Sequence, residues 1–236
     1  LHPDGDIPFF NDAAFGIAPH PKSILDYARK LGVSKPVPVS PTQVHYASGY
    51  IAVRRYGQVA FLDVAAIGPD YIPGHAHADT LSFEWSLHGQ RVLVNSGTSV
   101  YGVSDERLRQ RGTAAHNTVV VNGEDSSEVW SGFRVARRAK PFALQVEEKE
   151  SCTVVSAAHD GYHRLRPKVT HHREWRIAPG LMEVSDCLKG DFKSATANFH
   201  VHPDVRTSLK PGGMELLLPN GECCEVTVDG GYLESL

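Results

Sequence analysis

Two histidines and an aspartate alternate along the segment PGHAHADTLSFEW, at His75, His77 and Asp79. Imidazole and carboxylate groups transfer protons and bind transition metals. An unbroken β-strand would place all three on one face, together with the apolar Leu81 and Phe83. An unpaired polar group in such a buried place costs roughly 1–3 kcal/mol. The alternation therefore predicts either a metal ion or a hydrogen-bonded site that opens into a cleft.

A third histidine, His116, lies in TAAHNTVVVNG, immediately before a predicted strand. Cupin barrels also begin a metal site with His-x-His, but they require a glutamate four or five residues later. In this chain the first glutamate is Glu84, seven positions beyond His77, which excludes the cupin interpretation. His200 and His202 repeat the His-x-His spacing in a different predicted strand and are interpreted as structural.

Three arginines, Arg107, Arg109 and Arg111, alternate with other residues in ERLRQRG. An extended chain would present their guanidinium groups on one face, where they would bind carboxylate or sulfate through bidentate hydrogen bonds. The competing interpretation is that they pair with acids in the nearby segments DER and DSSE. Trp130 would suit stacking on a sugar ring, although a tryptophan of the sandwich core is the preferred interpretation.

Composition limits the classes of function. The 236 residues are 41% hydrophobic and 22% charged, so the chain can bury a core as one large all-β domain or two small ones. A net charge of -3 argues against nucleic acid as a partner, whereas local arginines still allow an acidic polysaccharide. No apolar run approaches the roughly 18 residues of a membrane span. The four cysteines include no C-x-x-C pair and are interpreted as reduced thiols.

One helix and then many strands must position these residues. An apolar stripe and a first-turn proline predict a helix over residues 21–31, and proline-rich residues 34–41 predict a linker. From residue 43 the chain consists of short β-branched or aromatic runs separated by turns, which is typical of an all-β antiparallel sandwich. The exception is a weak helical pattern over residues 104–111. The predicted strands are 49–56, 58–66, 80–87, 91–96, 117–122, 142–148, 152–159, 169–177, 181–188, 195–202 and 222–228.

Four segments occur in an order that resembles a known family. PGHAHADTLSFEW is followed by VNSGTSVYG, then ERLRQRGTAAHNTVVVNG, then DSSEVWSGFRVARRA. Together they resemble the β-sandwich of heparinase II/III-like polysaccharide lyases, and HHREWRI and NFHVHPD resemble its later strands. The upstream LHPDGDIPFFNDAA resembles the end of the family's helical (α/α) toroid. This implies a toroid tail plus linker in residues 1–41 and a sandwich domain in residues 42–236, with a C-terminal truncation compatible with the sequence.

The resemblance implies β-elimination at a uronic acid of an acidic polysaccharide. Such a lyase neutralises the substrate carboxylate, removes the C5 proton with a base and protonates the departing O4. In the family the base and acid come from the toroid, so we expect this chain alone to be inactive. His75 matches the family histidine that points into the cleft. Tyr101 resembles a tyrosine that reaches the substrate, with a packed, hydrogen-bonded tyrosine as the alternative.

The resemblance also implies a zinc ion. His77 and His116 match two of its ligands, but Asn95 stands where the family has an aspartate. Asparagine is neutral, and zinc prefers imidazole, thiolate and carboxylate. We therefore expect these three side chains to lie close together and to bind zinc more weakly than a His, Asp, His site. A metal-free hydrogen-bonded cluster is the alternative.

Two other classes of function remain open. One is a non-catalytic carbohydrate-binding or structural β-sandwich, and the other is a metal-dependent enzyme complete within these residues. Activity of the chain alone would favour the second. The particular polysaccharide does not follow from the sequence, and a periplasmic or secreted location is implied by the resemblance alone.

Overall fold

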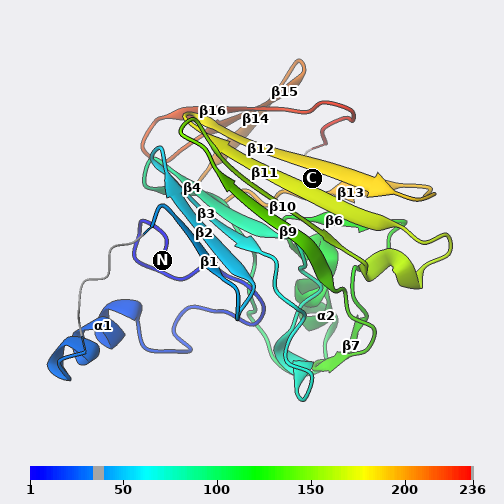
Figure 1. Cartoon of the computed structure of the whole chain (residues 1–236), viewed down its shortest axis with the longest axis horizontal. Helices are drawn as coiled ribbons and strands as arrows, with labels where there is room; N and C mark the ends of the chain where they lie inside the picture. Colours follow the sequence, from blue (N-terminus) through cyan, green and yellow to red (C-terminus); the bar gives the residue numbers. More distant parts are fainter. Residues whose placement is uncertain (34–39, 235–236) are drawn as a thin grey trace.

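A computed structural model describes residues 1–33 and 40–234. Its regular structure is almost entirely antiparallel β-sheet (Figure 1), which confirms the predicted antiparallel sandwich preceded by one short helix. The linker predicted for residues 34–41 falls mostly on residues 34–39, which lie outside the described residues.

Two large sheets form the sandwich. The first contains, in spatial order, β1 (Thr42–His45), β2 (Tyr50–Arg55), β3 (Gln58–Asp63), β4 (Phe83–Leu87) and β5 (Gln90–Leu93). The second has the order β12-β11-β10-β9, with β9 (Pro141–Glu148), β10 (Thr153–His159), β11 (Thr170–Ala178) and β12 (Leu181–Lys189). Strands that follow one another in the chain are therefore neighbours in each sheet, as in a meander of hairpins.

The inner faces of the two sheets share one core. Val53, Leu62 and Phe83 of the first sheet pack in one cluster with Val155 and Trp175 of the second, and all five side chains are fully buried. Burial of each large apolar side chain contributes about 1.5–3 kcal/mol. Alternate positions along the strands supply this core, which is the period that predicted the strands.

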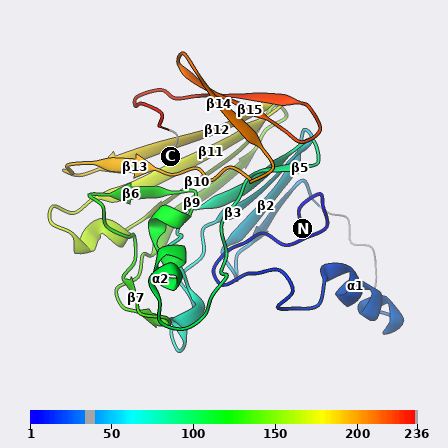
Figure 2. The ribbon, with the colours of Figure 1, turned by 180° about the vertical axis from the view of Figure 1, so that it is seen from behind.

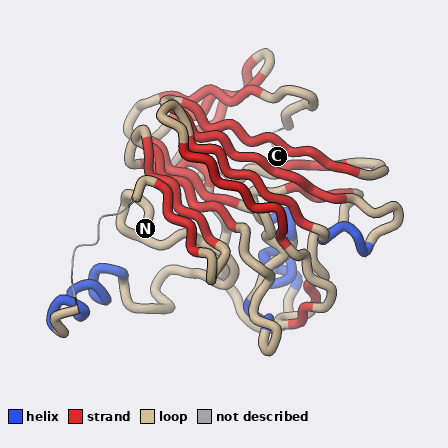
Figure 3. The backbone as a smooth tube through the Cα atoms, viewed as in Figure 1, coloured by secondary structure: helices blue, strands red, loops and turns tan. Residues whose placement is uncertain are grey.

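Smaller elements lie around the sandwich (Figures 2 and 3). β6 (Val119–Val121) pairs with β13 (Ala195–Ala197), and β7 (Val129–Trp130) pairs with β8 (Arg134–Val135). A three-stranded sheet contains β14 (Arg206–Lys210), β15 (Gly213–Leu217) and β16 (Cys223–Thr227). The helical elements here are α2 (Asp105–Arg111), η1 (Pro73–His75), η2 (Thr113–Ala115) and η3 (Gly161–Arg164).

Helix α1 (Pro21–Lys30) stands apart from the sheets (Figure 1). The helix predicted for residues 21–31 is confirmed, but none of its residues is buried. Its apolar Ile24 and Leu25 and the adjoining Leu31 are exposed. None of the described helices is long and apolar enough to cross a membrane.

The first thirteen residues cross the face of the first sheet that points away from the core (Figure 2). His2 hydrogen-bonds to Glu84 Oε2 and Ser86 Oγ, each at 2.8 Å. The Phe9 amide donates to Glu84 Oε1 at 2.7 Å, and the Thr98 amide donates to the Ala13 carbonyl at 3.0 Å. This segment, hereafter the N-terminal segment, is thus attached to β4 and to the loop after β5.

The segment before β4 differs from the prediction. The strand expected from residue 80 begins only at Phe83, and η1 occupies Pro73–His75. Leu81 also has a left-handed φ of 63°, which is incompatible with an unbroken strand. The strand alternation assumed for His75, His77 and Asp79 is therefore wrong. The His75 side chain is 65% exposed, whereas that of His77 is fully buried.

Candidate functional site

Asp12, in the N-terminal segment, is the centre of a polar cluster that the sequence analysis missed. Its Oδ2 accepts a hydrogen bond from His75 Nδ1 at 2.7 Å, and its Oδ1 accepts one from His77 Nε2 at 2.9 Å. Both terminal nitrogens of Arg107 donate to the same carboxylate. The name Asp12 cluster is used for Asp12, His75, His77, Arg107 and His116.

The electrostatics of this cluster favour an ionised carboxylate. Burial alone would raise the pKa of Asp12, but the hydrogen bonds from His77, Arg107 and His75 outweigh burial and hold the pKa well below its ordinary value. The Arg107 side chain is fully buried, so its positive charge depends on Asp12 for compensation. The pair is thus a fixed anion and cation beneath the surface.

Helix α2 places Arg107, and the extended chain predicted for the three arginines is wrong. Ser104 caps the helix by accepting from the Arg107 amide at 3.1 Å, as serine often does at a helix start. In a helix, residues four apart share a face. Arg107 and Arg111 are accordingly both turned inward and fully buried, while Arg109 is 63% exposed and pairs with Glu106 at 2.7 Å.

Arg107 and Arg111 therefore hold protein groups rather than present free guanidinium groups. Arg107 also donates to the Gly132 carbonyl at 3.0 Å. Arg111 donates to the carbonyls of Ala76 at 3.0 Å and Ser131 at 3.2 Å. These bonds join α2 to the segments on either side of the site. Arg109 donates to both oxygens of Glu106, as the competing interpretation of pairing with a nearby acid expected, and substrate contact by the three arginines stays a prediction.

His77, His116 and Asn95 lie together, but not around a single point. His77 Nδ1 lies 3.2 Å from His116 Nε2. Asn95 Oδ1 lies 3.3 Å from His116 Nδ1, which is the other nitrogen of that ring, and 3.4 Å from the Asn117 amide. The three residues therefore form a linear chain of contacts that continues from Asp12. Burial, with His77 and His200 nearby, holds the pKa of His116 well below its ordinary value, which favours the neutral imidazole.

This arrangement does not fit a zinc site built from these three side chains. Two nitrogen ligands of a tetrahedral zinc ion lie about 3.3 Å apart, so the spacing of His77 and His116 alone would suit either a hydrogen bond or an ion. Asn95, however, faces the far nitrogen of His116. Within residues 1–33 and 40–234, no three His, Cys, Asp or Glu side chains are grouped so as to hold a metal ion. Zinc binding stays a prediction.

His75 is the member of the cluster that reaches the surface. Its ring lies 6.3 Å from that of Tyr101 and 5.8 Å from that of Phe133, between centroids. Tyr101 and Phe133 stack on each other with an interplanar angle of 13°, and Arg107 lies 5.3 Å from each ring. Tyr101 is 52% exposed and Phe133 is 43% exposed. An imidazole, a phenol and an apolar ring thus share one exposed area.

Trp130, in β7, is also exposed, at 54%. The preferred interpretation of Trp130 as a core tryptophan is therefore wrong. β7 lies against α2, the helix that carries Arg107 (Figure 3). A third exposed aromatic side chain, on an element next to the site, leaves stacking on a sugar ring open for Trp130.

Asn11, next to Asp12, fixes the backbone of the site. Its Oδ1 accepts from the His77 amide at 3.1 Å, and its Nδ2 donates to the Tyr50 hydroxyl at 2.9 Å. Its own amide donates to Asp79 Oδ2 at 3.3 Å. Burial raises the pKa of Asp79 to about 6. Asn11 has a left-handed φ of 51°, which asparagine adopts more readily than most residues. The sequence NDAA is therefore compatible with this local conformation, but it does not indicate which residues Asn11 and Asp12 contact.

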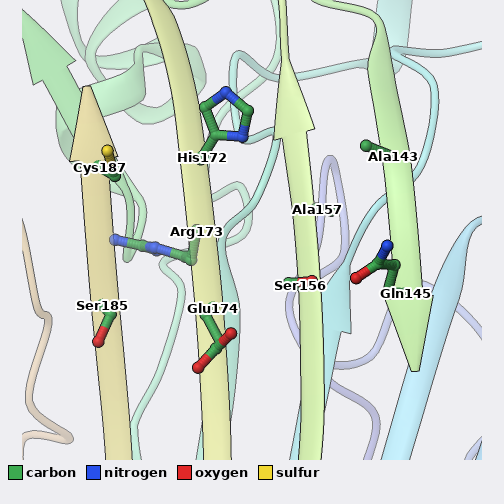
Figure 4. Close-up of a pocket in the computed structure, with 9 residues that line it drawn as sticks. All are labelled: Ala143, Gln145, Ser156, Ala157, His172, Arg173, Glu174, Ser185 and Cys187. Carbon is green, nitrogen blue, oxygen red and sulfur yellow. The ribbon is translucent and has the colours of Figure 1, made fainter. Parts of the chain in front are cut away.

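A surface hollow lies away from the Asp12 cluster. It has a volume of about 430 Å³ and lies on the outer face of the second sheet, over β9 to β12 (Figure 4). Gln145, Ser156, Glu174 and Ser185 are among its lining residues. None of the lining residues belongs to the Asp12 cluster. This hollow and the proton-transfer groups of the Asp12 cluster therefore occupy different parts of the surface.

A second histidine cluster lies in the second sheet and extends to its edge strand β12. Arg173 Nε and Nη2 donate to the two oxygens of Asp186 at 2.7 and 2.8 Å. His171 Nε2 hydrogen-bonds to Asp186 Oδ1 at 2.6 Å, and His171 Nδ1 lies 3.1 Å from His159 Nε2. The name Asp186 cluster is used for these four residues. The side chains of Arg173, His171 and His159 are fully buried.

Solved structures of similar fold are heparin and heparan sulfate lyases. Heparan sulfate lyase HepC from Pedobacter heparinus aligns with a TM-score of 0.70 at 16% identity, over 94% of this chain and 36% of that chain. Heparinase III gives 0.70 at 16% identity over 94% and 37%, and the heparinase III BT4657 gene product gives 0.69 at 16% over 92% and 34%. At this identity the likeness establishes the fold, and the chain spans about a third of the length of these structures.

The sequence comparisons identify the family. No curated protein matches the chain. The family model described as "Heparinase II/III-like, C-terminal" matches residues 39–235, which include the three histidines of the Asp12 cluster and both large sheets. The chain therefore belongs to the heparinase II/III-like C-terminal domain family.

Proposed function

We propose that the chain is the β-sandwich part of a polysaccharide lyase that cleaves a uronic-acid-containing polysaccharide by β-elimination. The observation that carries this proposal is the exposed His75, hydrogen-bonded through Nδ1 to the buried Asp12 carboxylate beside the exposed Tyr101. Heparan sulfate lyases share the fold, and an acidic polysaccharide is the substrate class that this proposal transfers to the present chain. A periplasmic or secreted location is part of the same proposal and rests on the family resemblance.

The chemistry assigns separate tasks to these groups. In β-elimination a base takes the C5 proton, the C4–O4 bond breaks, a C4–C5 double bond forms and O4 receives a proton. His75 Nε2 makes no hydrogen bond to any residue that the structure describes, so it is free to bind the substrate carboxylate or exchange a proton with the sugar. The Tyr101 hydroxyl is a second group available to the substrate. The principal base and acid are assigned to a helical toroid domain outside this chain, and His75 assists them.

A direct test measures the ultraviolet absorbance of the new C4–C5 double bond. We expect the chain alone to give no unsaturated product, because proximity to the toroid groups is lost. The same chain joined to a helical toroid domain should give product from a uronate polymer. His75→Gln should lower that rate by about 10²–10⁴-fold, the usual contribution of one proton-transfer group.

Matched variants separate chemistry from folding. His88→Gln changes an exposed histidine of the turn between β4 and β5, and should leave the rate unchanged. Tyr46→Phe is the corresponding control for Tyr101→Phe, since Tyr46 is 80% exposed. Turnover by the chain alone would favour a self-sufficient sandwich enzyme and overturn the proposal.

A second candidate is a non-catalytic carbohydrate-binding sandwich. The exposed aromatic side chains Trp130, Tyr101 and Phe133 favour it, because sugar rings stack on such surfaces without any chemical step. Binding of a polysaccharide that Trp130→Ala weakens, with no unsaturated product from either form of the protein, would support this candidate over the lyase.

A further inference from the structure

We propose that Asp12 is a positioning residue that fixes the tautomer and ring orientation of His75, so that Nε2 is the nitrogen presented at the surface. The inference deepens the proposed function, because His75 is the catalytic candidate there. It assigns part of the site to the N-terminal segment, which lies outside the residues 39–235 that match the family model.

The hydrogen bonds around the carboxylate define the proton on His75. An ionised carboxylate accepts hydrogen bonds and donates none. Oδ2 of Asp12 accepts from His75 Nδ1 at 2.7 Å and from Arg107 Nη2 at 2.8 Å. Oδ1 accepts from His77 Nε2 at 2.9 Å and from Arg107 Nη1. His75 Nδ1 must therefore carry hydrogen, and in the neutral imidazole Nε2 is then the unprotonated nitrogen.

Hydrogen bonds occupy both carboxylate oxygens of Asp12, so this position specifically requires an aspartate. Each oxygen already accepts two hydrogen bonds, from three different side chains. An Asn side chain at this position offers one oxygen and one NH₂ group, so one pair of donors would face another donor. His75 is the most exposed of the three side chains and is therefore the one able to turn away.

The backbone around Asp12 is held on both sides, so the carboxylate has little freedom to follow a moving ring. Before it, Asn11 bonds to the His77 amide and to Tyr50. After it, the Ala13 carbonyl accepts from the Thr98 amide at 3.0 Å. Asp12 itself is 8% exposed in its side chain. A buried acceptor on a fixed backbone beneath an exposed ring is the arrangement that orients an imidazole.

The test is NMR of the chain with ¹⁵N-labelled histidine at alkaline pH, where exposed imidazoles are neutral. The ¹⁵N shifts distinguish a protonated ring nitrogen from an unprotonated one, and His75→Gln assigns the signals. In the unmodified chain we expect a single tautomer of His75 with hydrogen on Nδ1. In Asp12→Asn we expect a mixture of both tautomers, as for an imidazole in water.

Two further variants keep the result independent of folding. Asp12→Asn leaves the buried Arg107 without its counter-charge, so Asp12→Asn/Arg107→Met removes both charges together and should give the same mixture. Asp204→Asn changes an aspartate whose side chain is 75% exposed and should leave the His75 signals unchanged. A single Nδ1–H tautomer in either folded Asp12 variant would overturn the proposal.

The outcome is separable from the proposed function. A tautomer mixture in the Asp12 variants supports the positioning role even if no form of the protein has lyase activity. Activity that depends on His75, combined with an unchanged tautomer in the Asp12 variants, would retain the lyase and remove Asp12 from its mechanism.

Discussion

The Asp12 cluster and the Asp186 cluster share the same arrangement of four residues, an aspartate, an arginine and two histidines. In each, an aspartate binds a fully buried arginine through both oxygens and also binds a histidine, which contacts a second buried histidine. The Asp186 cluster ends inside the protein, where the Gly161 amide donates to His159 Nδ1 at 3.1 Å. The Asp12 cluster has one additional member, the exposed His75.

This difference separates the Asp12 cluster, the candidate functional site, from the Asp186 cluster, which we interpret as structural. Buried charges with shifted pKa values occur in both clusters, so such shifts do not by themselves indicate function. The Asp186 cluster holds the loops below the site, since Arg173 also donates to the carbonyls of Leu81 at 2.8 Å and Asn117 at 2.5 Å. The Asp12 cluster holds a ring at the surface. An exposed imidazole, rather than charge, distinguishes the two.

The largest expected effect concerns stability and the Asp186 cluster. Asp186→Asn leaves Arg173 buried without its partner charge, and breaking such a pair costs about 3–5 kcal/mol. Urea unfolding should show this loss in free energy of unfolding. Glu183→Gln, in the exposed Arg176–Glu183 pair between the same two strands, is the control and should change little. Equal losses in both variants would mean that the Asp186 cluster is not a specific support.

The pH dependence of stability should come from histidines in both clusters. Burial holds the pKa of His159 and of His116 well below the ordinary 6.5. The unfolded chain therefore binds protons that the folded chain does not, and stability falls as pH drops below about 6.5 and is retained above it. Each histidine contributes a slope of at most about 1.4 kcal/mol per pH unit.

Substitution assigns that slope to a cluster. His159→Gln should lower by one the number of protons that the unfolded chain binds in excess of the folded chain. The measurement is urea unfolding between pH 5 and pH 7.5 (roughly the range in which histidine titrates). His88→Gln, at an exposed position, should leave the slope unchanged. If His159→Gln also leaves it unchanged, the acid sensitivity belongs to other groups.

A smaller expected effect is the stabilisation of the Asp12 cluster by zinc. Asn95→Asp adds a negative charge next to His116, and should raise zinc occupancy in metal analysis provided that the His116 ring turns, because the side chain at position 95 faces the nitrogen of that ring that lies away from His77. Zinc at about 100 times its Kd would then stabilise the fold by about 2.7 kcal/mol, visible as a higher Tm. Adding His77→Gln should abolish this gain. Stoichiometric, chelator-resistant zinc in the unmodified chain would show that the missing charge matters little.

The smallest expected effect lies within α2. Arg109→Gln removes an exposed side chain whose partner is the exposed Glu106, so the unfolding midpoint should hardly move. Arg107→Met, two residues earlier, should lower it clearly because it strands the buried Asp12 carboxylate. Similar shifts for both variants would contradict the assignment of the two helix faces.

The sequence predicted the elements with a strong local period. The eight-residue β9 and nine-residue β11 differ from their predicted bounds by about one residue, because alternation of buried and exposed positions is a local property. Helix α2 was indicated only by a weak helical pattern over residues 104–111, since seven residues are too few to show a clear apolar period. Its capping Ser104 and acidic first turn were the available signal.

The site was only partly predictable. The motif residues His75, His77 and His116 were found because they lie in recognisable segments. Asp12 was not, because its partners are 63 to 95 positions away and no local pattern encodes that contact. The strands β14 and β15 were also missed. They hold few fully buried side chains, so alternation there is weak.

The attachment of the N-terminal segment bears on how such a domain could be exchanged between proteins. The sequence predicts that the sandwich domain begins at residue 42. A fragment that begins there would lack Asp12, the carboxylate that pairs with Arg107. His2 and its bonds to Glu84 and Ser86 would be lost as well. The segment of sequence that encodes this site therefore includes the N-terminal segment, which precedes α1 in the chain. Recombination at the apparent boundary would separate the Asp12 carboxylate from the Arg107 guanidinium group.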